Sequence, residues 1–191
     1  MNVVAFNGSA RKQGNTAQLI EVVFSQLQAE GIATELVELS GKPIQGCVAC
    51  YKCFKNKNGR CAVKKDFANE CIEKMARADA IILGSPVYFS DLTASLKALV
   101  ERAGMVSRAN DDMLQRKVGA AVVAARRGGA TRAFDSINAF FFISQMIVPG
   151  SRYWNLGHGL QPGDVQKDEE GLATMECLGR NMAWLLKKLH G

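Results

Sequence analysis

The chain has 191 residues, of which 48% are hydrophobic and 22% are charged, and its formal net charge is +6. This length and this balance are typical of one globular domain with a substantial core. No apolar stretch reaches the ~18 residues of a membrane-spanning helix, and the first residues lack the basic region of a secretory signal. We therefore expect a soluble, cytoplasmic protein with no membrane partner.

The excess of positive charge raises the question of a nucleic-acid ligand. The basic residues are spread along the chain, however, and no helix-turn-helix or zinc-finger pattern accompanies them. An anionic cofactor or an acidic protein partner explains the charge at least as well. We therefore expect no nucleic-acid partner.

Continuous apolar runs alternate along the chain with stretches whose apolar residues recur at helical spacing. The predicted elements are, in chain order, a strand at 2–7, a helix at 15–29, a strand at 33–39, a helix at 66–78, a strand at 80–84, a helix at 92–106, a strand at 117–125, a helix at 128–145, a short strand at 146–148 and a helix at 169–190. Residues 40–65 interrupt the alternation, and residues 150–168 are expected to form a loop.

Strands that are apolar throughout are typical of a sheet that is covered on both faces. The alternation of strands and helices makes such a sheet parallel and doubly wound. No internal repeat, low-complexity tract or linker divides the chain. The sequence therefore predicts a single α/β domain over residues 1–191, with a five-stranded parallel sheet in a three-layer α/β/α arrangement and a cysteine-rich insertion at about 40–65.

The loop from Gly8 to Thr16, between the first strand and the first helix, has the composition of an anion site. Glycines permit close approach of the backbone, and the start of the helix offers unpaired amides at the positive end of its dipole. Polar and charged side chains add donors at Ser9, Arg11, Asn15 and Thr16. Ligands of a doubly wound sheet bind beyond the carboxyl ends of the strands, where this loop lies.

Other interpretations of this loop differ in the ligand. A Walker loop requires a lysine after its second glycine, and a dinucleotide loop requires G-x-G-x-x-G; both patterns are absent. Glu38, at the end of the second strand, nevertheless matches the acid that binds a nucleotide ribose. The loop on its own is also compatible with a turn that binds no ligand.

Two further loops extend the pattern: Gly84–Phe89 follows the third strand, and Arg126–Gly129 follows the fourth. Together with the glycine loop, they resemble the NADPH-dependent FMN reductase and iron–sulfur flavoprotein branch of the flavodoxin-like superfamily. The resemblance covers essentially the whole chain. It implies a flavodoxin-like fold and flavin mononucleotide (FMN) as the cofactor.

The resemblance also implies which residues bind FMN. In that family the first loop holds the phosphate, and the other two border the isoalloxazine ring from its two sides. The implied contacts are Ser9, Arg11, Asn15 and Thr16 with the phosphate, Pro86, Val87, Tyr88 and Phe89 with one side of the ring, and Ala125, Arg126, Arg127 and Gly128 with the other. Each residue taken singly also has a structural interpretation, so it is the conjunction of three loops that favours flavin.

Four of the six cysteines lie close together, at Cys47, Cys50, Cys53 and Cys61, where a structural disulfide is not expected in the cytoplasm. The C-x2-C-x2-C spacing allows one short segment to bind several corners of an iron–sulfur cubane. Zinc is the chemical alternative, although zinc sites usually pair two separate knuckles. A basic loop that binds no metal is the third interpretation.

The iron–sulfur flavoproteins carry a similar cysteine run at this place, so the resemblance implies a [4Fe–4S] cluster on these four cysteines. Basic residues surround them, and no acidic residue occurs between Ser40 and Lys65. This positive charge stabilises thiolates and would favour a reduced cluster. It would also attract an acidic electron-transfer protein such as ferredoxin. Cys71 and Cys177 are predicted to be core residues of helices.

These features predict a flavin-dependent oxidoreductase in which the flavin performs the chemistry. No side chain is identified as catalytic, and His158 and His190 are the only histidines. The leading interpretation is an iron–sulfur flavoprotein that passes electrons among a donor, the cluster, FMN and a small-molecule acceptor such as an oxygen species or a quinone. The alternatives are an NAD(P)H-dependent FMN or quinone reductase without a cluster and a non-enzymatic binding protein. Relatives of this kind are dimers or tetramers, so we expect a homodimer or homotetramer.

Overall fold

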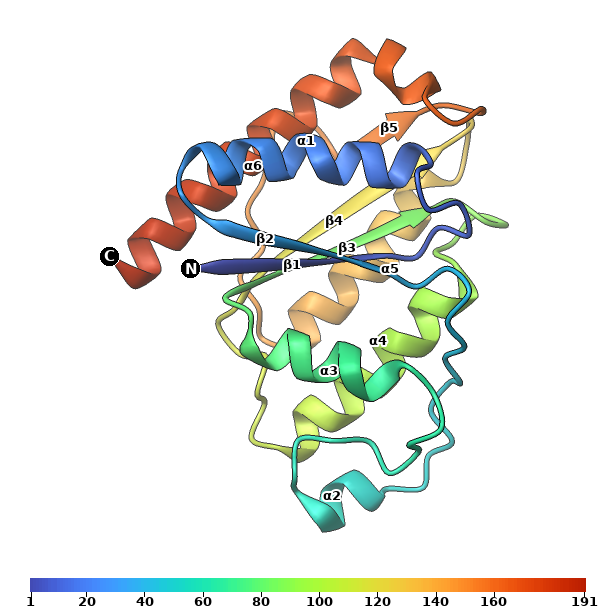
Figure 1. Cartoon of the computed structure of the whole chain (residues 1–191), viewed down its shortest axis with the longest axis vertical. Coiled ribbons are helices and arrows are strands. Elements are labelled where there is room, and N and C mark those ends of the chain that lie inside the picture. Colours follow the sequence, from blue (N-terminus) through green and yellow to red (C-terminus); the bar gives the residue numbers. More distant parts are fainter.

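A computed structural model describes all residues of the chain, 1–191 (Figure 1). The elements are, in chain order, β1 (Asn2–Asn7), α1 (Asn15–Ala29), β2 (Ala33–Glu38), α2 (Lys52–Asn56), α3 (Ala68–Arg77), β3 (Ala80–Pro86), α4 (Ala94–Ala109), β4 (Val118–Ala125), α5 (Ala130–Ile143), β5 (Leu156–His158), the 3-10 helix η1 (Asp164–Lys167) and α6 (Glu169–His190). None of the helices combines the length and the apolar character needed to cross a membrane.

The five strands form one parallel sheet in the order β2-β1-β3-β4-β5. Val3 of β1 lies opposite Thr34 of β2 and Ala80 of β3, so β1 occupies an interior position. The strand order reverses direction between β1 and β3, which is the switch point of a doubly wound sheet. The predicted flavodoxin-like fold is confirmed.

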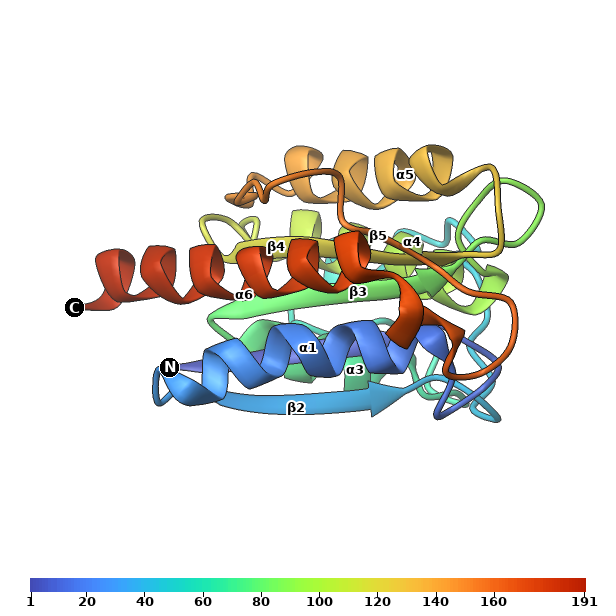
Figure 2. The same ribbon diagram turned by 90° about the horizontal axis from the view of Figure 1, so that it is seen from above.

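Two apolar cores sandwich the sheet because successive side chains of each strand point to opposite faces. Val3 and Ala5 pack with α1 and α6 in one core, and Val4 and Phe6 pack with α3, α4 and α5 in the other. Figure 1 shows α1 and α6 above the sheet and α3 and α4 below it. In Figure 2 the strand arrows point to one side of the molecule, where the loops gather, and both termini lie at the opposite side.

The fifth strand is not where the sequence predicted it. Of residues 146–148, only Ile147 pairs, through an isolated bridge to Val118. The fifth strand is instead β5, which lies inside the predicted loop and pairs with Val123–Ala125 at the carboxyl end of β4. The apolar run at 146–148 serves the core, where Met146 is buried. The prediction of a strand at 146–148 was therefore wrong.

The cysteine-rich segment contains a short helix that the sequence did not predict. This helix, α2, has left-handed residues at both of its ends, Tyr51 and Lys57. It lies at the far end of the molecule from α1 and α6 (Figure 1). The next helix, α3, starts at Ala68 rather than at Asp66, although a carboxylate oxygen of Asp66 accepts a hydrogen bond from the Ala68 amide at 3.2 Å.

Candidate functional site

A cavity opens at the carboxyl edge of the sheet, where four strands end. We call it the strand-end cavity. Its lining comes from the loops that follow β1, β3, β4 and β5, at Ser9, Arg11, Gly14, Asn15, Thr16, Pro86, Val87, Tyr88, Ala124, Arg126, Gly159 and Leu160. The position is the one at which doubly wound sheets bind ligands.

The β1–α1 loop presents unpaired donors to this cavity. Gly14 precedes α1 without a side-chain cap, and the amides of Asn15 and Thr16 donate to no protein acceptor. Ser9 shapes the loop from within, because its hydroxyl oxygen accepts a hydrogen bond from the Arg11 amide at 3.1 Å. Free amides at a helix start, with an arginine beside them, are groups that stabilise anions in proteins.

The loop after β5 closes the cavity against the β1–α1 loop. The side-chain oxygen of Asn15 accepts hydrogen bonds from the amides of Gly163 at 2.9 Å and Val165 at 3.4 Å. The Arg11 guanidinium donates to the carbonyl of Leu160 at 3.3 Å. Asn15 therefore connects two loops of the cavity through its side chain, in addition to supplying its amide.

The loops after β3 and β4 form the opposite wall. The Val87 amide donates to the Ala124 carbonyl at 2.9 Å, which continues the sheet pairing into the loop. Tyr88 and Asp91 then exchange two backbone hydrogen bonds and close a tight turn. At the tip of this turn, Phe89 has a left-handed backbone and a fully exposed side chain.

The twelve residues predicted to bind FMN divide into two groups. Eight of them line the strand-end cavity, namely Ser9, Arg11, Asn15, Thr16, Pro86, Val87, Tyr88 and Arg126. Four do not line it, namely Phe89, Ala125, Arg127 and Gly128. Phe89 points into solvent, and Ala125 is buried in the core that includes α5.

Sequence reasoning missed three lining residues, Ala124, Gly159 and Leu160. Ala124 lies next to the predicted Ala125, and Gly14 belongs to the predicted glycine loop. Gly159 and Leu160 were missed because their loop follows β5, whose position the sequence did not predict. The glycines of that loop were the available sequence signal. The structure shows why a glycine is needed: Gly159 N donates to Ala125 O at 2.9 Å, and a Cβ on Gly159 would lie 2.6 Å from Asn15 Nδ2.

Glu38 does not take the position of a ribose-binding acid. Its carboxylate accepts a hydrogen bond from Asn7 Nδ2 at 2.9 Å and does not line the strand-end cavity. Burial raises the pKa of Glu38, an effect that the hydrogen bond from Asn7 and the charges of Lys12 and Lys42 oppose. Neither histidine lines the cavity, and the side chain of His158 is exposed.

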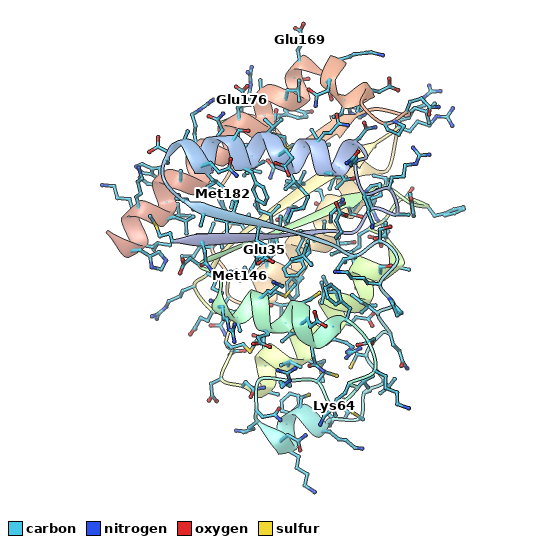
Figure 3. All side chains as sticks on the ribbon, in the orientation of Figure 1. Glu35, Lys64, Met146, Glu169, Glu176 and Met182 are labelled. Atoms are coloured by element: carbon cyan, nitrogen blue, oxygen red, sulfur yellow. The ribbon has the colours of Figure 1, made fainter.

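The four clustered cysteines line a second, mainly apolar cavity, which we call the cysteine cavity. Its lining is Cys47, Val48, Cys50, Tyr51, Cys53, Cys61, Ala62, Val63, Arg102, Met105 and Val106. The thiols are not arranged as a ready-made set of metal ligands. Cys53 is buried and Cys50 is exposed, and desolvation raises the pKa of the Cys53 thiol. Figure 3 shows Lys64 extending beside α2 at this end of the molecule.

The two remaining cysteines lie outside the cysteine cavity. Cys71 is fully buried in α3 and belongs to the core, where burial raises the pKa of its thiol to about 12. It therefore stays a neutral thiol at any physiological pH. Cys177 lies on α6, on the other side of the sheet, and is only partly buried.

A buried arginine supports the cysteine cavity from α4. Arg102 is 1% exposed, and its guanidinium donates to the Asp66 carboxylate, to Gln45 O at 3.1 Å and to Val63 O at 2.8 Å. Burial alone would raise the pKa of Asp66. The hydrogen bonds from Arg102 and from the Gln45 and Ala68 amides outweigh burial and lower that pKa.

Known proteins resemble this chain over nearly its whole length. An iron-sulfur flavoprotein of Methanocaldococcus jannaschii is 38% identical over 194 residues, which cover 98% of both chains. An iron-sulfur flavoprotein of Methanosarcina thermophila is 31% identical, over 100% of this chain and 97% of the relative. The solved structure of RosB with a bound intermediate, 8-demethyl-8-formylriboflavin-5'-phosphate, superimposes with a TM-score of 0.78 at 18% identity, over 99% of this chain and 80% of that chain.

The family model for NADPH-dependent FMN reductase matches residues 1–161. This match includes β1 to β5 and every residue that lines the strand-end cavity. Together with the fold, it shows that the chain belongs to the NADPH-dependent FMN reductase family and is a flavin-dependent oxidoreductase of the flavodoxin-like superfamily.

Proposed function

We propose that the strand-end cavity binds FMN, with the phosphate on the β1–α1 loop and the isoalloxazine ring between the loops after β3 and β4. The observation that carries this proposal is that free amides at the start of α1 and the side chain of Arg11 meet in one cavity with Pro86, Val87 and Tyr88. Anions are stabilised at helix starts. The flat isoalloxazine ring suits the wall of the cavity that Pro86, Val87 and Tyr88 form.

Each part of the cavity has a role in this proposal. Ser9, Arg11, Asn15 and Thr16 would hold the phosphate, as the sequence predicted. Pro86, Val87 and Tyr88 would border the ring on one side, and Arg126 would approach it from the other. FMN supplies hydride and single-electron transfer when it is bound. The protein would position the ring and limit its exposure to water, and no side chain is assigned as a general acid or base.

We also propose that Cys47, Cys50, Cys53 and Cys61 hold a [4Fe–4S] cluster. The four thiols line one cavity, and a buried donor of that cavity, Arg102 Nε, has no nitrogen or oxygen acceptor. The sulfur atoms of a cluster would offer this donor an acceptor. The spacing also favours a cluster over zinc, because three ligands lie on one C-x2-C-x2-C run. The four thiols would come together as the cluster binds, since metal sites commonly assemble on binding.

The proposed enzyme passes electrons between a reduced donor, the cluster, FMN and a small-molecule acceptor such as an oxygen species or a quinone. An acidic protein such as ferredoxin is the proposed donor, and the assembly is proposed to be a homodimer or homotetramer. A second candidate is an NAD(P)H-dependent FMN or quinone reductase that works without a cluster. The family match favours this alternative, because the function it describes is reduction by NADPH.

Anaerobic purification tests both cofactors in one sample. We expect flavin absorbance together with iron and acid-labile sulfide in equal amounts, about four of each per chain for a cubane cluster. In the Cys50→Ala variant, iron and sulfide should be lost and FMN retained. The matched control is Cys177→Ala, because Cys177 lies on α6 outside both cavities.

The outcomes separate the two candidates. Flavin without iron in the wild-type protein would remove the cluster and leave the NAD(P)H-dependent reductase. Loss of flavin from Cys50→Ala, with iron retained, would show that the two cavities do not hold the cofactors as proposed. A wild-type protein that retains no flavin and gains none on addition of FMN would overturn the main proposal.

A further inference from the structure

Arg102 is the only charged residue that lines the cysteine cavity, and it is 1% exposed. Its two terminal nitrogens have acceptors: Nη1 donates to Asp66 and to Gln45 O, and Nη2 donates to Val63 O. Its third nitrogen, Nε, is buried and has no nitrogen or oxygen acceptor, and the Cys61 side chain lies beside the guanidinium. Because a buried donor without an acceptor is unfavourable, this nitrogen needs an explanation.

The other charges near the cysteines differ from Arg102 in exposure. Lys52, Lys55 and Lys64 lie on the same segment and are exposed, so water and salt screen them. Glu101 accepts a hydrogen bond from the Cys47 amide at 3.2 Å, and it too is exposed. Arg102 is therefore the one charged residue of the lining, and with its buried partner Asp66 it acts on the cavity through a poorly screened, mainly apolar medium.

Asp66 fixes where this charge lies. Its carboxylate accepts hydrogen bonds from the Arg102 guanidinium, from the Gln45 amide at 3.0 Å and from the Ala68 amide at 3.2 Å. The Asp66 side chain is itself almost fully buried. The ion pair therefore fixes the position of the guanidinium. From there Arg102 donates to the carbonyls of Gln45 and Val63, which lie before and after the cysteines in the chain.

We propose that Arg102 belongs to the cluster site, where its Nε donates a hydrogen bond to a sulfur of the cluster and its charge favours the reduced state. This inference rests on the proposed [4Fe–4S] cluster. One-electron reduction by a low-potential donor adds one negative charge and requires no proton, since an arginine stays charged throughout. Hydrogen bonds to sulfur and nearby charge set the potentials of such clusters.

The ion pair allows a test in which two substitutions shift the potential in opposite directions. Arg102→Gln removes the positive charge and should shift the cluster potential to more negative values. Asp66→Asn removes the compensating negative charge while Arg102 remains, and it should shift the potential to more positive values. If the ion pair acted only by holding the fold, both substitutions would break the same contact and would not shift the potential in opposite directions.

Two variants complete the series. Arg102→Lys keeps the charge and loses Nε, so we expect a negative shift smaller than that of Arg102→Gln. Arg108→Gln is the matched control, because Arg108 lies on the same helix and is exposed. Its cluster potential should equal that of the wild-type protein.

The experiment is a redox titration of the anaerobically purified holoprotein, followed by electron paramagnetic resonance of the reduced cluster. Iron, sulfide and FMN contents are measured for every variant, and the FMN potential serves as an internal reference that should not move. If Arg102→Gln fails to fold or to retain the cluster, the signs for Asp66→Asn and Arg102→Lys decide the outcome.

Unchanged cluster potentials in Arg102→Gln and Arg102→Lys, with the cluster retained, would overturn this inference and leave the proposed function intact. Shifts of the same sign in Arg102→Lys and Asp66→Asn would overturn it as well. Absence of iron and sulfide from the wild-type protein would overturn the proposed cluster and the role of Arg102 together.

Discussion

Gly159 connects the backbone of the β5 loop to the proposed phosphate site. It lies where β5 meets the β1–α1 loop, and its amide donates to the Ala125 carbonyl at 2.9 Å. The absence of a side chain leaves room for Asn15, whose oxygen accepts the Gly163 and Val165 amides. The loop after β5 thereby fixes a residue that is proposed to contact FMN.

We expect Gly159→Ala to weaken FMN binding by up to about tenfold. The added Cβ would lie 2.6 Å from Asn15 Nδ2 and 2.8 Å from the Val165 nitrogen, so the two loops must separate. Disturbing one such hydrogen bond costs ~1 kcal/mol, and ~1.4 kcal/mol corresponds to a factor of ten. Quenching of FMN fluorescence on titration with apoprotein measures the affinity.

Gly150→Ala is the matched control, because a Cβ at that position meets no atom within 4 Å. It should bind FMN as the wild-type protein does. If Gly159→Ala binds FMN equally well, the β5 loop does not support the phosphate site.

The residues of the site that the sequence could predict share one property. Ser9, Asn15 and Thr16 belong to a continuous loop whose composition itself indicates an anion site. Ala124 and Ala125 illustrate the opposite case: both are buried, on opposite faces of the sheet, and the alternation of the strand decides that only Ala124 also lines the cavity. When every residue of a strand is apolar, the composition does not reveal which residues point to which face of the sheet.

At the scale of elements, the sequence predicted α1 and α6 with their observed bounds, since both have amphipathic repeats over many turns. β5 was not predictable in the same way. It has three residues, Leu-Gly-His, and it is a strand only because β4 pairs with it. A short edge strand of this kind is determined by partners far away in the sequence.

Asn155 anchors this edge strand. It is buried, its Nδ2 donates to Ala121 O at 2.9 Å, and its carbonyl accepts the Val123 amide at 3.0 Å. We expect Asn155→Ala to lower the free energy of unfolding by about 1–3 kcal/mol, because Ala121 O is left without that donor. Faster hydrogen exchange over residues 156–160 should accompany the loss. Urea denaturation and exchange mass spectrometry measure the two effects.

Asn181→Ala is the control for this prediction. Asn181 Nδ2 donates to Gly150 O at 2.8 Å, but the side chain is exposed. Its loss should change the stability by no more than ~0.5 kcal/mol. Equal effects of the two substitutions would show that Asn155 is not a specific anchor of β5.

At the scale of the whole molecule, the cysteine-rich segment and the helices α1 and α6 lie at opposite ends (Figure 1). The cysteine-rich segment starts at the carboxyl end of β2 and passes α2, which lies far from α1 and α6 (Figure 1). Around α2, the exposed side chains of Tyr51 and Phe54 alternate with exposed lysines. An apolar centre with a charged rim suits transient protein docking.

For the docking of an acidic protein, the placement of the basic residues therefore matters more than the net charge of +6. We expect reversal of three exposed lysines around α2, in the variant Lys52→Glu, Lys55→Glu, Lys57→Glu, to slow reduction by an acidic ferredoxin at least tenfold at low salt. The reason is that like charges would then oppose the encounter. Added salt should reduce the difference, because screening weakens both attraction and repulsion. Stopped-flow reduction under anaerobic conditions measures the second-order rate constant.

The matched control reverses three exposed basic residues elsewhere, in the variant Arg132→Glu, Arg152→Glu, Lys188→Glu. Both variants have the same net charge, so a difference between them reports placement alone. Only the first variant should be slow, and both should be reduced by dithionite at the wild-type rate, since that small donor needs no docking surface. If both variants are equally slow with ferredoxin, total charge governs the encounter and the surface around α2 is not the docking site.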